Sequence, residues 1–489
     1  MTETNSLPIS ILGIPVKPLT LAETLEEIEK FVELYRKDER PRYIATLNID
    51  FLVNIHGWVW DRIRSPELLN ILRSADLVTL DGMPLVWLAK GMGSSIPERV
   101  TGVDLIAALA STAAAAHQSL FLLGGSEKVL SLTKIYIEAE NPRLQIVGTS
   151  AALISIDNDH LEKQIEGDAM LIEKINKSKP TILILNLGHP KQEVWFERVR
   201  DRLQVPVTIG VGGTFNLLTG MVPLAPEWMQ KWGLEWLYRL YQEPKRLFKR
   251  YLLELFKFPA IALPPLLYSF LPRKNKETFL LQDPLLFIAA HQTFSLQKLP
   301  PILDLIAARE LQRRNEDLLA HEKLILDFSR VRTCSLEGMA WLVNLWQKGK
   351  REGKQVIALS VPASIRALFR LQRVWDLIET DYCESPKYAL ELINYQEQLL
   401  GFYDAVEQDK TGIRLSFFGN LDRHSDPETY LEKRGPLLLH KKCIVDLHYC
   451  TYIDNSGLIF LEKLKNYCKA HSTSIELVNA KIISKSSIH

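Results

Sequence analysis

The stretch ILILNLGHPKQE, residues 182–193, decides the fold class. Its first half is a short apolar run, which predicts a strand over Ile182–Leu187 buried on both faces. Similar runs predict five more strands, over Tyr43–Ile49, Leu77–Leu80, Leu120–Leu123, Leu144–Gly148 and Val207–Val211. Because amphipathic helical patterns lie between these runs, the alternation predicts an open α/β sheet, mostly parallel, with right-handed crossovers.

The first helix has a clear start signal. Thr20 and Glu23 fit a capping box, in which a hydroxyl and a carboxylate satisfy each other's free backbone N–H groups. Apolar residues then keep helical spacing from Leu21 to Tyr35, so we expect a helix that begins directly after Thr20.

Polar and glycine residues gather where the predicted strands end. The strand ends read Thr46-Leu47-Asn48, Asp81-Gly82, Gly124-Gly125, Gly188 to Glu193, and Gly210-Val211-Gly212-Gly213. Open α/β sheets bind ligands beyond the carboxyl ends of their strands. We therefore expect a ligand cleft at this edge of the sheet.

Asp81 is the sharpest catalytic candidate. An Asp-Gly pair after a buried strand places a carboxylate at the rim of the cleft, and Gly82 lets a substrate approach the backbone. Such a carboxylate could take a proton from an attacking sugar hydroxyl. It could equally cap the helix that begins near Pro84, and the pattern alone favours neither role.

Thr46 and Asn48 stand two residues apart at a strand end, so their side chains face the same way and could bind a sugar. The alternative is a turn residue followed by a helix cap. The glycine sites could cradle a diphosphate with backbone N–H groups, although helix–sheet packing alone could also require them. These glycines are Gly124, Gly125, Gly210, Gly212 and Gly213.

Composition argues against several other functions. The net charge of +1 gives no bulk attraction to nucleic acid. The five cysteines lie in the C-terminal half without a Cys-x-x-Cys pair, which predicts free thiols in a reducing compartment and no zinc site. Asp157-Asn158-Asp159 resembles an Asp-x-Asp metal motif, but we interpret it as a solvated turn because no other acidic ligands are evident nearby. No metal or cofactor is expected.

The acidic N-terminus does not resemble a signal peptide, so a cytoplasmic protein is expected. No stretch reaches the about 18–20 apolar residues of a membrane span, and the nearest, 258–271, is short and contains three prolines. The segment 228–256 instead mixes tryptophan and tyrosine with lysine and arginine, a composition that suits a helix lying in a membrane interface. The alternatives are an ordinary domain-closing helix, or arginines that meet an anionic diphosphate.

Residues 278–489 contain a weak internal repeat. A strand ending in aspartate is followed eleven residues later by a glycine that opens a helical pattern, at Asp327 and Gly338 and again at Asp446 and Gly457. Equal spacing in two copies predicts two duplicated small α/β domains.

Taken together, the motifs of residues 8–257 resemble the WecG/TagA/CpsF family of glycosyltransferases. The resemblance rests on six ordered blocks in addition to the Thr46–Asn48 strand end: 75–84, 97–104, 121–125, 188–193, 210–215 and 225–239. It implies a Rossmann-like domain that transfers a sugar from UDP-N-acetylmannosamine, or a related UDP-sugar, with inversion and without a metal. The implied acceptor is a polyprenyl-diphosphate-linked sugar at the inner membrane face.

The resemblance also implies roles for individual residues. Asp81 matches the family's proposed catalytic base. The implied substrate-binding residues are Thr46, Asn48, Arg99, Gln192, Arg239 and Arg246. The last two belong to a basic, aromatic segment that matches the family's membrane-docking appendage, which is expected to sit peripherally on anionic lipid. Asn186 and Asn216 depart from the family's usual residues, which leaves the donor sugar open.

The C-terminal repeat resembles two STAS-type domains. In the second, Asp454-Asn455-Ser456-Gly457 is similar to the family's Asp-Ser-Ser-Gly switch, with Asn455 at the usual phosphoserine position. In the first, Ser335-Leu336-Glu337-Gly338 lacks both the aspartate and the serine at the corresponding positions. We therefore expect docking of a protein partner or self-association rather than phosphoswitching.

These inferences divide the chain into a transferase domain over 1–257, which includes a docking segment over 223–257, a linker over 258–277, and STAS-like domains over 278–400 and 401–489. The main hypothesis is a polysaccharide glycosyltransferase with appended interaction modules. The alternative is a catalytically inactive membrane scaffold that acts through its STAS-like domains.

Overall fold

A computed structural model gives the fold. It describes residues 6–58, 63–152, 154, 161–226, 228–229, 232–270, 285–288, 293–384, 402–408, 412–421, 427–439, 442–453 and 455–479. The chain separates into two compact units, one of which comprises 1–272 with 339–344 and 368–374, and the other the remaining residues.

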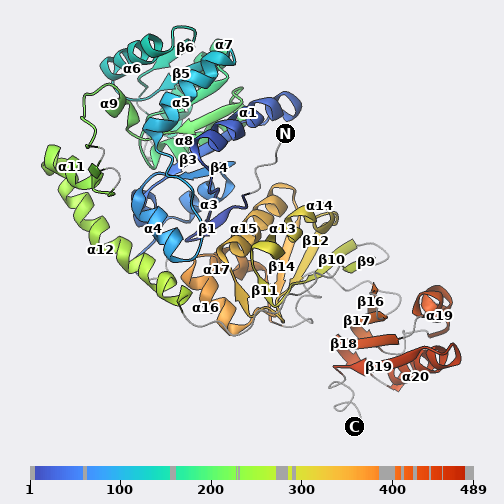
Figure 1. The fold of residues 1–489 in the computed structure, drawn as a ribbon. Coiled ribbons are helices and arrows are strands. Elements are labelled where there is room, and N and C mark those ends of the chain that lie inside the picture. The colour runs from blue at the N-terminus through green and yellow to red at the C-terminus, as the bar shows by residue number, and fades with distance from the viewer. Residues whose placement is uncertain are drawn as a thin grey trace. The chain divides into compact units, whose positions relative to one another are not determined.

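Six parallel strands form the sheet of the first unit, in the order β4-β3-β8-β7-β5-β6 (Figure 1). Their bounds are β3 Arg42–Leu47, β4 Leu77–Leu80, β5 Ser119–Leu123, β6 Gln145–Ser150, β7 Ile182–Leu185 and β8 Val207–Gly210. All six predicted strands are confirmed, with ends that differ by no more than two residues. A short hairpin of β1 (Ile9–Ile11) and β2 (Ile14–Val16) precedes them and was not expected from the sequence.

Helices connect these strands. They are α1 Leu21–Asp38, α2 Ile49–Ile55, α3 Pro66–Ser74, α4 Met83–Gly91, α5 Gly102–Ala115, α6 Glu127–Glu140, α7 Leu161–Ser178, α8 Lys191–Val199 and α9 Thr214–Leu218. The predicted capping box opens α1: the Glu23 N–H donates to Thr20 Oγ1 at 3.2 Å and the Thr20 N–H donates to Glu23 Oε2 at 2.8 Å. Apolar side chains of α1, α5 and α6 pack on the sheet in one continuous core cluster, which fixes the strand ends relative to one another.

Two further helices complete the first unit, α11 (Glu235–Gln242) and α12 (Pro244–Ser269). The helix α12 continues through Pro259, Pro264 and Pro265, although a linker was expected from residue 258. The sequence analysis also found too short an apolar stretch here, because Leu247–Ser269 is long and apolar enough to cross a membrane by length and composition. In its most apolar 18-residue stretch, 22% is buried. One such helix is weak evidence for a span.

The second unit holds two larger sheets, of order β15-β14-β12-β10-β9 and β16-β17-β18-β19. The strands are β9 Leu285–Ile288, β10 Thr293–Lys298, β12 Lys323–Asp327, β14 Gln355–Leu359, β15 Tyr382–Cys383, β16 Phe402–Gln408, β17 Ile413–Leu421, β18 Lys442–Ile453 and β19 Ser474–Val478, with a small pair β11 Ile302–Leu303 and β13 Thr333–Cys334. The helices of this part of the chain are α13 Leu305–Arg313, α14 Asn315–Leu318, α15 Leu336–Arg351, α16 Ala363–Leu371, α17 Trp375–Ile378, α19 Pro427–Arg434 and α20 Asn455–Ala470. Residues 339–344 of α15 and 368–371 of α16 are counted with the first unit. Each sheet begins with an antiparallel pair and continues with parallel strands.

The two halves of the repeat share local contacts as well as strand order. Asp327 Oδ1 accepts from the Ser329 N–H at 2.8 Å, and Asp446 Oδ1 accepts from the His448 N–H at 3.0 Å. In both copies the aspartate thus accepts from the N–H two residues further on. Asp327 ends its strand as predicted, whereas β18 continues beyond Asp446 to Ile453, so the predicted strand end at Asp446 was wrong. The five cysteines of the chain are buried and free, as predicted. Asp157–Asp159 and Asp454 lie outside the described residues, as does the side chain of Asn455.

The glycines of the repeat also occupy equivalent places. A Cβ added to Gly338 would lie 2.3 Å from the carbonyl oxygen of Leu303, and one added to Gly457 would lie 2.1 Å from that of Leu421. In both copies, therefore, the glycine lets the helix lie directly against a neighbouring strand backbone.

Candidate active site

Two adjoining cavities open where β4, β3, β8 and β7 end, at the edge that the sequence predicted. The larger, of about 640 Å³, is lined mainly by polar and glycine residues that follow these four strands. The smaller, of about 290 Å³, is lined by apolar residues of α4, α11 and α12, among them Met83, Trp236 and Leu255. Seven residues line both cavities, namely Asn48, Asp50, Asp81, Arg99, Glu235, Arg239 and Arg250.

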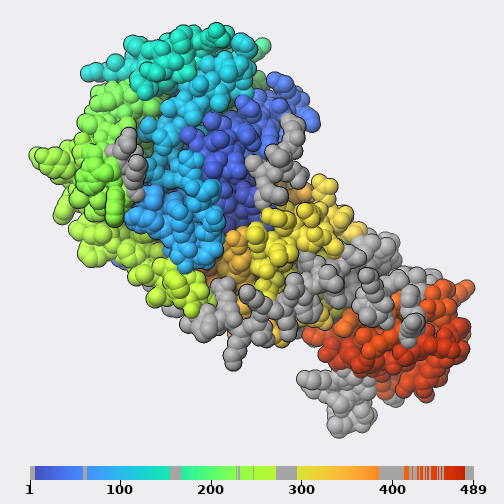
Figure 2. All heavy atoms as spheres, viewed as in Figure 1, coloured from blue at the N-terminus to red at the C-terminus, as the bar shows by residue number. Residues whose placement is uncertain are grey.

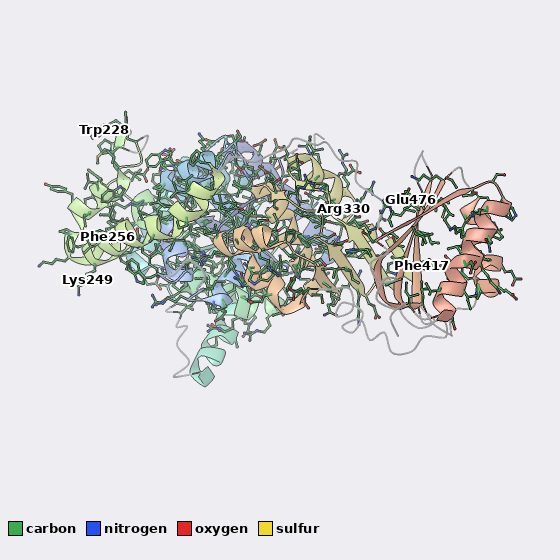
Figure 3. All side chains as sticks on the ribbon, turned by 90° about the horizontal axis from the view of Figure 1, so that it is seen from below. Trp228, Lys249, Phe256, Arg330, Phe417 and Glu476 are labelled. Carbon is green, nitrogen blue, oxygen red and sulfur yellow. The ribbon has the colours of Figure 1, made fainter. Side chains whose placement is uncertain are left out.

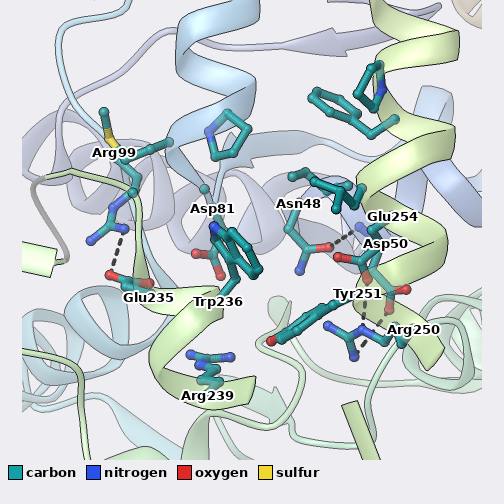
Figure 4. A pocket seen from close by; sticks show the side chains of 18 residues that line it. Asn48, Asp50, Asp81, Arg99, Glu235, Trp236, Arg239, Arg250, Tyr251 and Glu254 are labelled. Atoms are coloured by element: carbon teal, nitrogen blue, oxygen red, sulfur yellow. Dashed lines mark hydrogen bonds and ion pairs between the residues drawn. The ribbon is translucent and has the colours of Figure 1, made fainter. Parts of the chain in front are cut away.

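Asp81 follows β4 directly and lines both cavities. Figure 4 shows it in the smaller one. Burial raises the pKa of its carboxyl from 3.8 to about 6, with Arg239 and Arg99 opposing the shift and Glu235 adding to it. Helix α4 begins at a Gly82 N-cap and no side chain caps it, so the helix-capping alternative for Asp81 is not what the structure shows. A half-buried carboxylate with such a pKa is suited to accept a proton near neutral pH.

Arg99 and Arg239 supply positive charge beside Asp81. Arg99 Nη1 lies 2.8 Å from Glu235 Oε1, and this ion pair joins the segment before α5 to the start of α11 (Figure 4). Because the carboxylate occupies only part of the guanidinium, its remaining N–H groups stay available to an anionic ligand.

Thr46 and Asn48 both reach the larger cavity, and both also hold the local backbone. The Thr46 hydroxyl donates to the carbonyl oxygen of Gly210 at 3.1 Å, which ties the ends of β3 and β8 together. Asn48 caps α2, since its Oδ1 accepts from the Asp50 N–H at 3.0 Å. The side-chain NH₂ of Asn48 is thereby turned away from the cap and can serve a substrate.

Gln192 is the centre of a buried network. Its Nε2 donates to Glu193 Oε1 at 2.7 Å, and its Oε1 accepts from the Gly212 N–H at 3.0 Å. Glu193 also accepts from the hydroxyl of Tyr43 at 3.0 Å. This network fixes the turn after β8, so a predicted substrate-binding residue also positions the glycine loop beside it.

The predicted glycine sites separate into two groups. Gly212 and Gly213 line the larger cavity, and Gly212 has a φ of +64°. Gly210 serves packing, because a Cβ there would lie 2.3 Å from the Tyr43 hydroxyl. Gly124 and Gly125 line neither of these two cavities, and a Cβ on Gly124 would lie 2.6 Å from the carbonyl oxygen of Asn186. The packing alternative therefore accounts for the glycines after β5.

The segment after the sheet contributes residues that the sequence analysis did not single out as site residues. Arg250 Nε lies 2.8 Å from Glu254 Oε1, its Nη1 lies 3.7 Å from Asp50 Oδ2, and all three side chains line the smaller cavity. Asp50 stands two residues after the Asn48 cap, and Arg250 belongs to the basic run of 228–256, so both lie close to motifs that the sequence analysis recognised. Arg239, which was predicted to bind substrate, lines both cavities, whereas the side chain of Arg246 lies outside the described part of the chain.

Apolar side chains are exposed along α11, α12 and the turn before them. Figure 2 shows this segment in yellow-green at the surface of the first unit. The exposed side chains include Trp228 (59% exposed), Trp232 (71%), Tyr241 (86%), Phe248 (56%), Leu255 (55%), Phe256 (62%) and Leu267 (62%). We call these residues the apolar surface. Trp228 and Phe256 project outward on the same side of the first unit as Lys249 (Figure 3).

A parallel α/β sheet with a carboxylate and two arginines at the rim of a split cleft is suited to group transfer. The chain belongs to the glycosyl transferase WecG/TagA/CpsF family, whose model matches residues 9–268, and it is therefore a glycosyltransferase. The model of a second family, described as Mlab, STAS domain, matches residues 298–379. The chain thus combines a transferase domain with a STAS domain.

Relatives share this transferase domain. N-acetylglucosaminyldiphosphoundecaprenol N-acetyl-beta-D-mannosaminyltransferase of Bacillus subtilis is 28% identical over 270 residues, which cover 55% of this chain and 94% of the relative. The protein of the same name from Bacillus spizizenii is 28% identical over 236 residues, or 47% and 84%. That from Staphylococcus aureus strain MW2 is 24% identical over 243 residues, or 50% and 88%.

Proposed function

We propose that this protein transfers N-acetylmannosamine, or a closely related N-acetylhexosamine, from a UDP donor to a polyprenyl-diphosphate-linked sugar during the synthesis of a cell-surface polysaccharide. The observation that carries the proposal is the position of Asp81 where the polar and the apolar cavity meet. The names of the relatives support the sugar and the lipid-linked acceptor.

The polar cavity is assigned to the donor. It combines arginine side chains with the backbone N–H groups of a glycine turn after β8, which suits a nucleotide diphosphate. The apolar cavity is assigned to the acceptor, because Met83, Trp236 and Leu255 offer a surface for the start of a hydrocarbon chain.

The reaction is a single displacement with inversion. Asp81 takes the proton of the acceptor hydroxyl, the hydroxyl oxygen bonds to the anomeric carbon, and the bond from that carbon to the UDP oxygen breaks. Arg99 and Arg239 offset the charge that develops on the leaving diphosphate, without a requirement for a metal ion.

Docking to the inner face of the membrane brings the enzyme to its acceptor. The apolar surface of α11 and α12 enters the interface, and lysines 245 and 249 meet anionic headgroups. Each basic residue near such a surface contributes about 1 kcal/mol. The C-terminal repeat, including a second STAS-like domain over 401–489, serves as a docking or self-association module.

The test is UDP release from a panel of UDP-N-acetylhexosamines with a synthetic lipid-diphosphate-GlcNAc acceptor, in the presence of EDTA. Acceptor-dependent turnover that is lost in Asp81→Asn, and kept in the exposed control Asp201→Asn, supports the proposal. Turnover that disappears with EDTA refutes metal independence. Absence of turnover with every donor, in a protein that still binds anionic vesicles, favours the scaffold alternative.

A further inference from the structure

His189 lies at the polar cavity on the turn that joins β7 to α8. It follows Gly188, whose φ is +76°, and immediately precedes the helix that carries Gln192. His189, Gly188 and Gln192 line the cavity together with Gly212 of the turn after β8. The imidazole is therefore placed beside the loop that we assign to the donor diphosphate.

Two contacts fix the orientation of this ring. Its Nδ1 lies 3.2 Å from Glu193 Oε2, and its centroid lies 3.7 Å from the ring centroid of Phe51. The side chain is 5% exposed. Because one nitrogen is held by the carboxylate and one ring face by the phenyl group, Nε2 is the single polar atom of the ring left for another partner.

The charge of Glu193 bears on the state of the ring. Its side chain is fully buried and accepts from the Tyr43 hydroxyl and Gln192 Nε2, both of which are neutral donors. Among the described residues, His189 is the only basic side chain within ion-pair distance of Glu193. A buried carboxylate is costly without a positive partner. The charges of Glu193 and His189 balance when the imidazole carries a proton on both nitrogens, and Nε2 is then a hydrogen-bond donor.

Nε2 has no hydrogen-bond partner among the described residues, although it is buried. Other polar groups around it are satisfied: Glu193, Gln192 and the Gly212 N–H all have partners. A buried polar atom left without a partner in an otherwise satisfied network, at the wall of a cavity, indicates the place of a ligand atom.

We propose that His189, held by Glu193 and Phe51, donates its Nε2–H to the diphosphate of the nucleotide-sugar donor and keeps this hydrogen bond while the UDP group leaves. This inference rests on the proposed function, since it takes a UDP-sugar as the ligand of the polar cavity. His189 is then a catalytic residue that stabilises charge on the leaving group, on the opposite side of the reaction from the base Asp81.

Other ionisable groups face the same cavity or the ring, and each affects the binding of an anion: Glu193, Tyr43, Asp50, Asp81, Asp104, Arg99, Arg239, Arg250, Glu235 and Glu243. The contribution of His189 to anion binding is therefore measured as a difference in affinity between wild type and variant, in which the effects of the other groups cancel.

The experiment is calorimetric titration of the full chain with UDP-N-acetylmannosamine and with uridine, without acceptor. Uridine carries no diphosphate, so it serves as the control ligand. His189→Phe keeps a ring against Phe51 but removes both nitrogens, and His189→Gln supplies a neutral donor near the place of Nε2.

We expect His189→Phe to weaken the binding of the UDP-sugar by about tenfold, with uridine affected less than about twofold. His189→Gln should recover part of the affinity. Equal losses for both ligands, or a UDP-sugar affinity unchanged in His189→Phe, would overturn the role of His189 alone. A wild-type protein that binds no UDP-sugar would overturn this inference and the proposed function together.

If His189→Phe fails to fold, as judged by thermal unfolding, the comparison of wild type with His189→Gln decides. An affinity for UDP-N-acetylmannosamine, relative to uridine, that is unchanged in His189→Gln would then contradict the proposal, because a neutral donor binds a diphosphate less tightly than an imidazolium does.

Discussion

Arg99 Nη1 and Glu235 Oε1 lie 2.8 Å apart, and this pair links the rim of the parallel sheet to the helix α11 that follows the sheet domain. Both residues act on the pKa of Asp81, in opposite directions. The ion pair therefore connects closure of the site by α11 with the proton affinity of the proposed base.

Glu235→Gln should move the activity profile toward lower pH. Removing this carboxylate removes a cause that raises the pKa of Asp81, so the base is ionised at a lower pH. Arg99→Gln should move the profile the other way, because the guanidinium lowers that pKa. The measurement is kcat/KM against pH for both variants and wild type. Shifts of the same sign in both variants would argue against Asp81 as the group that titrates.

Asp81→Asn should abolish transfer and leave the fold intact or more stable. The pKa of Asp81 is raised from 3.8 to about 6, so the folded state binds this proton more tightly than the unfolded chain does. Ionising the carboxyl in the folded state therefore costs free energy above about pH 6, whereas asparagine does not ionise. Chemical unfolding should show Asp81→Asn more stable than wild type by about 1–3 kcal/mol at neutral pH.

This gain should shrink as the pH falls through about 6 toward about 4, where both states of the wild type bind the proton. A variant that is less stable at every pH would show that Asp81 is held by contacts that favour its ionised form.

Gln192→Ala should lower both stability and activity. The substitution leaves the Gly212 N–H without its acceptor and removes one donor from buried Glu193. Loss of a partner for a buried polar group costs about 1–3 kcal/mol. Denaturant unfolding measures this loss, and Gln145→Ala on exposed β6 is the matched control, with an expected change within about 0.5 kcal/mol. A Gln192→Ala protein as stable as the control would contradict the network.

Replacing Trp232 and Phe256 by serine should release the protein from lipid vesicles. These side chains are 71% and 62% exposed on the apolar surface. Their transfer into the interface removes apolar area from water, at about 25 cal/mol per Å². Co-sedimentation with anionic vesicles measures binding, and Ile135→Ser on α6, itself 63% exposed, is the control. Equal binding by the double variant and the control would place the membrane contact elsewhere.

Gly457→Ala and Gly338→Ala should destabilise the second unit to a similar degree. Each new Cβ would meet a strand carbonyl oxygen within 2.3 Å, so the helix has to move away from its sheet. Overpacking of this kind costs about 1–3 kcal/mol. Gly167→Ala on α7, where a Cβ meets nothing within 4 Å, is the control and should be neutral or slightly stabilising. A Gly457→Ala variant that behaves like this control would argue against two equivalent domains.

The sheet was predictable because its strands are buried on both faces and so appear as uninterrupted apolar runs. The strand order was not, since periodicity does not encode which strands become neighbours. Thus the ends of β4, β3, β8 and β7 could be named individually, but their common cleft emerges from the order of the sheet. Gly124 was assigned to the cleft for the same reason, although it packs against the backbone of Asn186.

The helix α12 shows the limit of local rules for proline. Pro259 and the pair Pro264–Pro265 predict an interruption from propensity alone, and the structure instead continues the helix to Ser269. Contacts outside the prolines hold its first half: Lys257 Nζ donates to the carbonyl oxygen of Val53 at 2.6 Å, which anchors α12 to α2. Such tertiary contacts were not visible in the sequence.

The prolines of α12 also bear on how deeply this helix can enter a bilayer. A proline has no N–H, so Pro259 leaves the carbonyl of Leu255 without its usual helical donor, and Pro264 and Pro265 do the same one turn further on. Hydrocarbon offers no replacement donor, whereas water among lipid headgroups does. Carbonyls that lack their usual helical donors are therefore better suited to the hydrated boundary of a bilayer than to its hydrocarbon core. Under the proposed function, this favours α12 lying along the membrane surface. The enzyme would then meet the sugar end of its lipid-linked acceptor without drawing that lipid out of the membrane.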